Sequence, residues 1–444
     1  MFDFLQGNKE IDYEKKPGDI EICLDNKNKP VIIPRQDRFL HTLIIGVSGC
    51  GKYAQSFIPM IYQDMQNPEY GITVIEPNGY LSEKTYAMAK LFNRNVVYFN
   101  PLLPMCPHFN PLHGEEITVV EKIVWAFYEF NKDSDIYYLD IHEKLLRKSV
   151  AVLKRLFGND VTLNDLSKLV NDTDGSGVKI IDQFSNLSVT DNLNDEQLKE
   201  HDETVNWFKE EYFAEGSKAY TDCIALRSQI DRLISNKYLK NILNPSKDDK
   251  VLNFNDHLKN GDVVIINTSL GALRDIGKLL GHMLMMDFED CVFRRPGNEQ
   301  TRKPNFLYVD HFQVFCNDGY VDMLTMGRAY RVASHIGITS KDEIPENMRN
   351  VVLTNARNAI IYPGSSQSDT EYYAKQFNSI AKDDVFTASN IRFRNFGEIT
   401  YGIVKKNSLQ NPDFGKVNYI PKDINDLLDM ITMVVHECTS PYKG

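Results

Sequence analysis

The chain alternates short apolar runs with longer amphipathic stretches. Each apolar run has a suitable length for one buried strand, and most of the intervening stretches repeat apolar residues at helical spacing. This alternation predicts a largely parallel, buried α/β sheet. The predicted strands are residues 41–45, 71–75, 96–99, 262–267, 305–310, 333–338 and 359–362.

Two regions depart from this alternation. Residues 17–40 read as a small β region, with two apolar runs on either side of a turn-like segment. Between the third and fourth predicted strands the sequence is almost wholly helical and longer than a simple crossover requires, which predicts an inserted all-α domain. We expect this insert at residues 115–225, between a first part of the α/β domain at 1–114 and a second part at 226–444.

The composition is that of a globular protein, with 42% hydrophobic and 25% charged residues among 444. Seven scattered cysteines without a CxxC pair resemble neither a disulfide framework nor a zinc site, and they indicate a reducing, cytoplasmic setting. No apolar run approaches the roughly eighteen residues that cross a bilayer. The net charge of −11 argues against indiscriminate binding of duplex DNA but leaves a local basic channel open.

The most specific motif is Gly-Val-Ser-Gly-Cys-Gly-Lys, which ends at Lys52 and lies between a predicted strand and a helical stretch at 54–65. This order is typical of a phosphate-binding loop. Its glycines let backbone N–H groups converge on one cavity, the helix start adds a positive dipole end, and Lys52 reaches the β and γ phosphates. The alternative is a glycine-rich turn before a helix. The residues expected to bind ATP are Gly46, Ser48, Gly49, Cys50, Gly51, Lys52 and Tyr53.

The residue after the lysine departs from this motif. A Ser or Thr hydroxyl normally ligates Mg²⁺ there, whereas this chain has Tyr53. A phenol oxygen lies farther from the backbone than a serine hydroxyl, and its ring would crowd the metal. The motif therefore predicts that phosphate binding is retained while Mg²⁺ placement is impaired.

A second motif is the apolar run 305–309, which ends on Asp310 as a Walker B strand does. Asp310 is the predicted catalytic and metal-binding carboxylate, because it would hold the hydration shell of Mg²⁺. In hydrolysing relatives of this class the next residue is normally Glu, which polarises the attacking water, but this chain has His311. His311 is a candidate base, and the alternative is a structural histidine after a strand.

Over residues 17–400 the chain resembles the type IV coupling protein family, hexameric ATPases that hand DNA and protein substrates to a secretion channel. The resemblance implies a RecA-like P-loop domain with an inserted all-helical domain. It also implies secretion or conjugation proteins and single-stranded DNA as partners. The family usually has N-terminal membrane helices, and their absence before Gly18 predicts either a lineage without them or a trimmed form. The matching segments are 41–46, the proline at 59, 109–112, 228–233 and 327–332.

The departures from the family concentrate where its chemistry takes place. Its Asp-Pro-Lys-Gly-Asp motif reads Glu76-Pro-Asn-Gly-Tyr80 here, and Thr339 stands where the family has a glutamine that senses the γ-phosphate. By the same resemblance, Arg357 is a candidate for the arginine that reaches a neighbouring subunit's site, and the alternative is a surface arginine. A separate pattern, Arg392 alternating with Arg394 around a phenylalanine, predicts a strand with both arginines on one face.

These observations lead to one main hypothesis and two alternatives. The main hypothesis is a cytoplasmic pseudo-ATPase of a type IV secretion or conjugation system, which binds ATP, hydrolyses it poorly and serves recruitment or assembly. It would form a homo- or hetero-oligomeric ring and would reach the inner face of the membrane only through partners. The first alternative is an active ATP-driven DNA translocase with unusual Mg²⁺ ligation, and the second is an interaction module without nucleotide affinity. Whether the chain is an enzyme stays open at this point.

Overall fold

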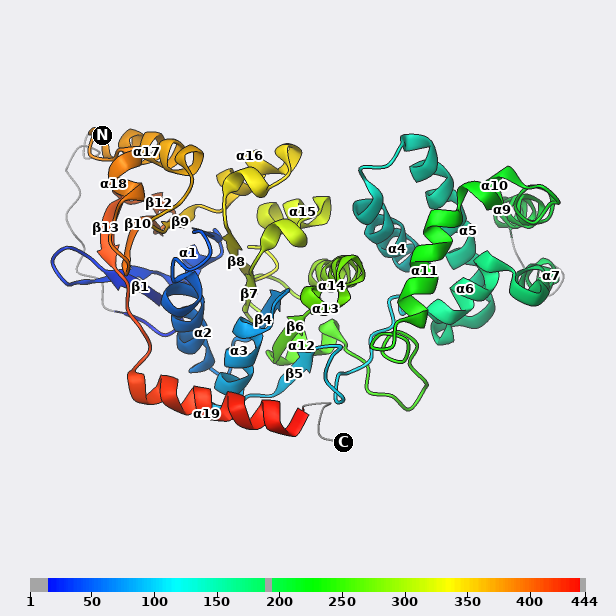
Figure 1. The fold of residues 1–444 in the computed structure, drawn as a ribbon, viewed down its shortest axis with the longest axis horizontal. Coiled ribbons are helices and arrows are strands. Elements are labelled where there is room, and N and C mark those ends of the chain that lie inside the picture. The colour runs from blue at the N-terminus through cyan, green and yellow to red at the C-terminus, as the bar shows by residue number, and fades with distance from the viewer. Residues whose placement is uncertain (1–14, 188–193, 440–444) are drawn as a thin grey trace.

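The structure, a computed structural model, describes residues 15–187 and 194–439, and the description below concerns these residues. Figure 1 shows an elongated molecule with an α/β body at one end and a helical lobe at the other. The main sheet has eleven strands in the order β2-β1-β13-β10-β9-β3-β8-β7-β4-β6-β5. From β9 to β5 all neighbours are parallel, whereas β10, β13, β1 and β2 pair antiparallel.

The fold class and the strands predicted from apolar runs are confirmed. In the parallel part, the strands are β3 (Thr42–Ile45), β4 (Gly71–Glu76), β5 (Val96–Phe99), β6 (Val263–Asn267), β7 (Asn305–Val309), β8 (Val332–Ile338) and β9 (Asn358–Ile361). The antiparallel part consists of β1 (Ile20–Leu24), β2 (Pro30–Ile33), β10 (Glu398–Gly402) and β13 (Asp413–Lys416). β11 (Val404–Lys405) and β12 (Ser408–Leu409) form a separate small pair.

Helices cover both faces of the sheet, which explains why its central strands are apolar at successive positions. Leu43 and Ile45 belong to the core that also contains α14 (Asp275–Phe293), whereas Ile44 belongs to the opposite core with α2 (Ile58–Met65) and α3 (Tyr80–Leu91). The other helices of the body are α1 (Arg35–Arg38), α12 (Phe254–Asn260), α13 (Leu270–Leu273), α15 (Asp318–Met326), α16 (Glu346–Asn355), α17 (Gln367–Ala381) and α18 (Ala388–Arg392).

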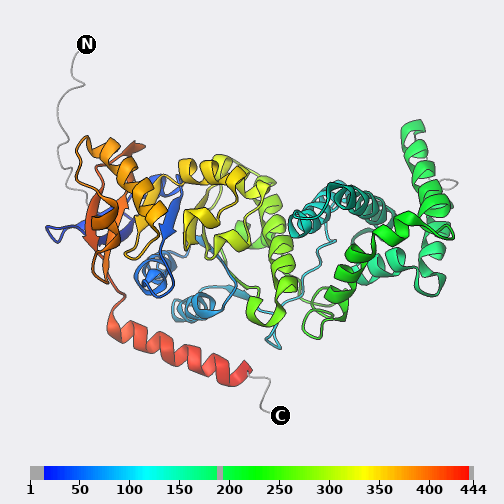
Figure 2. The same cartoon turned by 45° about the horizontal axis from the view of Figure 1, so that its top comes forward.

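The helical insert between β5 and β6 is present and forms the second lobe (Figures 1 and 2). It begins with α4 (Glu116–Asn131), which packs along α14 of the body. Its last helix is α11 (Ile224–Ser235), which packs on α6 (Leu163–Asn171). The predicted end of the insert, residue 225, falls inside α11, and this domain boundary stays a prediction. The remaining helices are α5 (Ile136–Phe157), α6 (Leu163–Asn171), α7 (Ser176–Ser185), α9 (Asp195–Asn206) and α10 (Lys218–Asp222).

The predicted strand around Arg392 and Arg394 is wrong. Thr387 and Asn390 form a reciprocal capping box, in which each side chain bonds the other's backbone N–H, and this box starts α18. The helix ends at Arg392, and β10 begins only at Glu398. The two arginines therefore do not share a strand face.

A long C-terminal helix, α19 (Lys422–Thr439), lies against α3 and appears in Figure 2 as a rod along one side of the body. Leu428 is buried in this contact, and Lys84 of α3 forms an ion pair with Asp429. Within the described ranges, no helix combines the length and the apolar character needed to cross a bilayer.

Candidate nucleotide site

The glycine-rich segment forms a tight loop directly between β3 and the helix that follows. Gly49 and Gly51 have φ angles of 80° and 97°, which side chains with a Cβ rarely adopt. Gly46 is needed for a different reason, because a Cβ there would lie 2.8 Å from Cβ of Tyr362. Each of the three glycines thus meets a geometric requirement of the loop.

The side chain of Cys50 is directed into the protein. It is 7% exposed, and a Cβ on Gly46 would lie 2.5 Å from its sulfur. Burial raises the pKa of the Cys50 thiol, so this sulfur stays protonated. Ser48 and Gly49 are exposed at the tip. The loop therefore faces solvent through its backbone and Ser48, as phosphate binding requires.

The helix after the loop starts with a π-helical turn (Tyr53–Phe57), and α2 continues from Ile58. Pro59 is the second residue of α2, directly after this turn. π turns are frequent at functional sites, and this one contains Tyr53.

Lys52 links the loop to the two neighbouring strands. Its Nζ donates to the carbonyl of Ile338 at 3.2 Å and lies 3.4 Å from Oδ1 of Asp310. The side chain is only 9% exposed. Because β3, β8 and β7 are parallel neighbours, their carboxyl ends bring the loop and the acid together.

Asp310 is fully buried, and its Oδ2 is engaged by two protein donors. Tyr53 donates its hydroxyl to this oxygen at 2.5 Å, and Nδ1 of His311 lies within hydrogen-bond distance of the same atom. Burial alone would disfavour the carboxylate, but His311 and the charge of Lys52 outweigh it and lower the pKa of Asp310. Asp310 is therefore ionised at neutral pH, with Oδ1 left without a hydrogen bond from the described residues.

Tyr53 keeps its proton in this arrangement. Burial and the adjacent Asp310 carboxylate raise the pKa of the Tyr53 phenol well above its usual value. Its ring is fixed between Phe57 and Tyr80, with centroid separations of 6.3 and 5.8 Å. A neutral phenol held in this way is a hydrogen-bond donor to the carboxylate.

His311 has a backbone φ of 51°, which turns its ring back toward Asp310. The hydrogen bond to Asp310 raises the pKa of His311 in spite of partial burial. A histidine that is bonded to the carboxylate and prone to carry a proton is poorly suited to remove one from water. The geometry thus indicates that His311 holds the Asp310 carboxylate in position and does not act as a base.

These residues do not fit Mg²⁺. That ion requires near-octahedral oxygen ligands at about 2.0–2.1 Å. Here Oδ2 already accepts from Tyr53 and His311, the phenol occupies the side where a metal-binding hydroxyl would stand, and the Lys52 ammonium faces Oδ1. The tip of the glycine loop, in contrast, is open, because nothing lies within 4 Å of a Cβ placed on Gly49.

Glu76, the first residue of the altered motif at 76–80, is a further site residue that was not among the predicted ones. It ends β4, next to β7, and lies fully buried near Asp310. Its Oε1 accepts from the N–H of Ser82 at 2.5 Å, and burial raises the pKa of Glu76 to about 7. The signal was available, since an acid directly after an apolar strand was visible in the sequence.

Thr339 and Arg357 lie at opposite ends of the parallel strands. Thr339 follows β8, half-buried, next to the Ile338 carbonyl that accepts from Lys52. Arg357 precedes β9 and donates to the carbonyl of Asn407 at 3.3 Å. The phosphate loop follows the carboxyl end of β3. Because β9 is parallel to β3, the start of β9 lies at the opposite end of the strands from this loop. Thr339 is therefore near this site, whereas Arg357 is not part of it within one chain.

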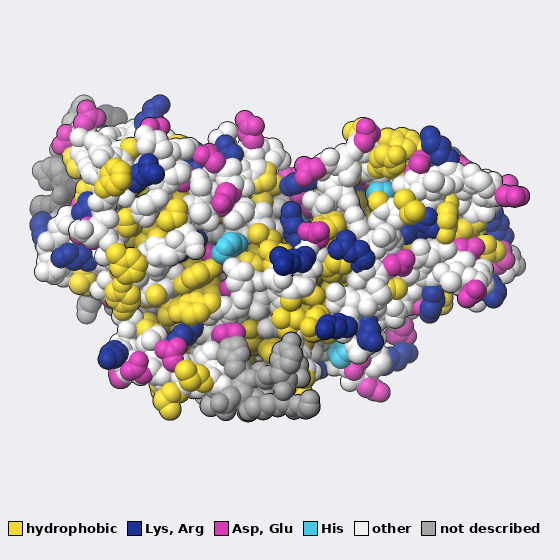
Figure 3. Space-filling model, viewed as in Figure 1, with side chains coloured by type: hydrophobic (Ala, Val, Ile, Leu, Met, Phe, Trp, Pro, Cys, Tyr) yellow, Lys and Arg dark blue, Asp and Glu magenta, His cyan; other side chains and the backbone are white. Residues whose placement is uncertain are grey.

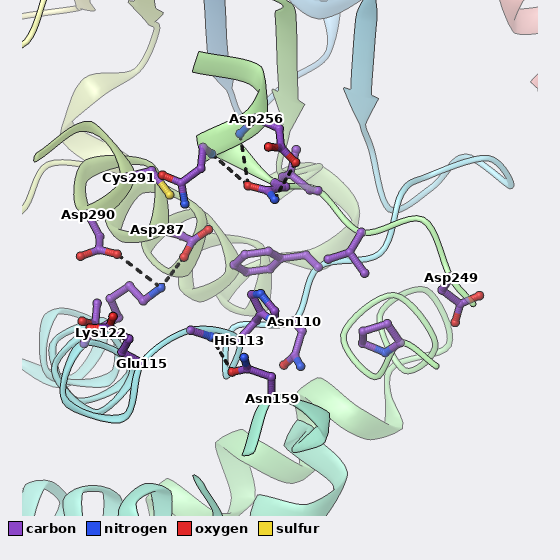
Figure 4. Close-up of a pocket in the computed structure, with 18 of the residues that line it drawn as sticks. Asn110, His113, Glu115, Lys122, Asn159, Asp249, Asp256, Asp287, Asp290 and Cys291 are labelled. Carbon is purple, nitrogen blue, oxygen red and sulfur yellow. Dashed lines mark hydrogen bonds and ion pairs between the residues drawn. The ribbon is translucent and has the colours of Figure 1, made fainter. Parts of the chain in front are cut away.

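A cavity of about 740 Å³ lies elsewhere, between the insert and the body (Figure 4). Lys122 of α4 forms an ion pair with Asp287 of α14 across one wall. Arg294, just after α14, pairs with Glu115 at 3.3 Å. This cavity is at the junction of the two lobes and is separate from the phosphate loop.

The fold and the loop define a P-loop-like α/β architecture with a helical insert. Neither a protein-family model nor a curated protein sequence matches the chain. Among solved structures, the plasmid coupling protein TrwB with ADP and Mg²⁺ is similar at a TM-score of 0.63 and 15% identity, over 92% of this chain and 91% of that one. TrwB with the non-hydrolysable GTP analogue GDPNP gives 0.62 and 15%, over 91% and 90%. VirB4 of Thermoanaerobacter pseudethanolicus gives 0.54 and 12%, over 92% and 99%. The similarity is thus one of fold.

Proposed function

We propose that this protein is a coupling-protein-like component of a type IV secretion or conjugation system that binds a nucleoside triphosphate and hydrolyses it poorly. The observation that carries this proposal is the state of Asp310, whose Oδ2 is engaged by Tyr53 and His311. A carboxylate bound in this way does not hold a magnesium hydration shell. The role that remains is a nucleotide-dependent one in recruitment or assembly.

Nucleotide binding is supported by the loop itself. Its glycines, the start of the following helix and Lys52 are the elements that hold polyphosphate in P-loop proteins. TrwB, which shares this fold, has been solved with ADP and Mg²⁺ and with GDPNP. ATP is the expected ligand here, bound without a well-placed Mg²⁺.

Poor hydrolysis is supported by two side chains. Phosphoryl transfer needs the metal to neutralise developing charge and a residue to orient water. Tyr53 replaces the metal-binding hydroxyl, and His311 replaces the water-orienting acid while it is bonded to Asp310. Thr339, where a γ-phosphate sensor is expected, has a shorter side chain than glutamine.

We further propose assembly into a ring, either of this chain alone or with a catalytic relative. Arg357 lies at the end of the strands remote from its own phosphate loop. In such a ring it could therefore reach only the nucleotide site of a neighbouring subunit. In Figure 3, Lys and Arg side chains gather along the junction between the two lobes, which supports contact with single-stranded DNA there. The protein would act in the cytoplasm, at the inner face of the membrane through partners.

The test combines nucleotide binding with turnover. We expect ATP and ADP to raise the melting temperature, since a ligand of the native state stabilises it, and Lys52→Ala to abolish this effect. We expect turnover near background with Mg²⁺, and a gain in the double variant Tyr53→Thr/His311→Glu. Turnover of the wild type that single-stranded DNA stimulates and Lys52→Ala removes would contradict the proposal and favour an active translocase.

A further inference from the structure

The order of strands fixes the direction in which a nucleotide lies on the loop. Lys52 reaches from the loop after β3 toward Asp310 after β7, with β8 between them. The γ-phosphate end must face Lys52, since the lysine of a P-loop holds the β- and γ-phosphates. The α-phosphate, ribose and base therefore extend to the other side of β3, toward the end of β9.

The segment after β9 lies close to the phosphate loop and is bonded to the residue before an exposed phenylalanine. A Cβ on Gly364 would lie 3.4 Å from Cγ2 of Val47 in the loop. The N–H of Gly364 donates to the carbonyl of Arg392 at 2.9 Å, and Phe393 follows directly. Gly364 thus lies beside Val47 of the loop and is bonded to the residue before Phe393, on the side where the base is expected.

Phe393 is unusually exposed for its size, at 75%. The guanidinium of Arg392 lies 5.7 Å from its ring centroid, and Arg392 also donates to Oε1 of Gln367 at 3.3 Å. The cation is thus held beside the ring, which helps to keep the ring in place. An exposed, steadied aromatic face is what base stacking requires.

A second exposed ring lies at the same end of the strands. Tyr419 follows β13, which runs antiparallel to β10 and hence in the same direction as β9. Its hydroxyl accepts from Nε2 of Gln55 at 2.5 Å, which ties it to the first turn after the loop. Tyr419 is 55% exposed.

We propose that Phe393, steadied by Arg392, is the platform on which the base of a purine nucleotide stacks, with Tyr419 bordering the same site. This inference rests on the proposed nucleotide binding and adds the residue that recognises the base. Stacking uses the face of the base and not its edge, so adenine and guanine nucleotides bind alike.

The test compares ATP and GTP with inorganic tripolyphosphate, which has the phosphates but no base, in calorimetric titrations of the full chain. We expect Phe393→Ala to weaken ATP and GTP roughly five- to a hundred-fold, as loss of one stacking ring does, and to leave tripolyphosphate affinity unchanged. Phe157→Ala, at an exposed phenylalanine of the insert, is the control and should change neither.

The outcomes separate this inference from the function on which it rests. Equal ATP affinity in Phe393→Ala and wild type, or wild-type ATP affinity no higher than that of tripolyphosphate, would overturn the platform while leaving phosphate binding intact. A parallel loss of tripolyphosphate in Phe393→Ala would show a structural role and also overturn it. A wild type that binds none of the three ligands would overturn the proposed function as well.

Discussion

Replacement of Tyr53 by phenylalanine tests the contact on which the interpretation of the site depends. The variant keeps the ring between Phe57 and Tyr80 and removes only the hydroxyl that donates to Asp310 at 2.5 Å. A hydrogen bond to a charged group contributes about 1.5–3 kcal/mol. Because Tyr53 is only half-buried, we expect the lower end of that range, with the free energy of unfolding reduced by about 1.5 kcal/mol.

Urea unfolding at neutral pH measures this difference, since a stability change appears as a shift of the midpoint at constant slope. Tyr80→Phe is a matched control, because Tyr80 packs on the same ring but is 49% exposed, and we expect a change within about 0.5 kcal/mol. If Tyr53→Phe and Tyr80→Phe unfold at the same urea concentration, the phenol does not stabilise the Asp310 carboxylate and the reasoning about the site is wrong.

Two further predictions concern neighbouring residues. The pKa of Glu76 is raised from an ordinary value of 4.5 to about 7, so its contribution to stability is present below about pH 4.5 and is lost as the pH rises through 7. The stability of wild type relative to Glu76→Gln should therefore fall by up to about 3 kcal/mol between pH 5 and pH 8, and a pH-independent difference in urea unfolding would refute this. Gly46→Ala should destabilise the protein by about 1–3 kcal/mol, because its Cβ would lie 2.8 Å from Cβ of Tyr362. A melting curve equal to that of wild type would contradict this close packing.

The parts of the fold that follow local rules were predictable from the sequence. Short apolar runs predicted the parallel strands, and two motifs named Lys52 and Asp310, which the parallel order of β3, β8 and β7 brings together. The contact between Tyr53 and Asp310 was not predictable, since it joins residues 257 positions apart and depends on the rotamer of one ring. The helix that ends at Arg392 was missed because a capping box outweighed an alternating pattern that is typical of strands.

Glu76 shows a different limit. Its position after a strand was visible in the sequence, but its proximity to Asp310 follows from the pairing of β4 with β7, which the order of residues along the chain does not specify. Its raised pKa depends on complete burial, which only the packed structure reveals.

The cavity at the junction of the two lobes has a consequence for the effect of salt. Ion pairs between exposed side chains weaken as the ionic strength rises, whereas partly buried pairs are screened much less. The cavity of about 740 Å³ is bordered by the largely buried pair of Lys122 and Asp287 and by the exposed pair of Arg294 and Glu115. Added salt would therefore weaken the Arg294–Glu115 pair first, while Lys122 and Asp287 continue to connect α4 with α14.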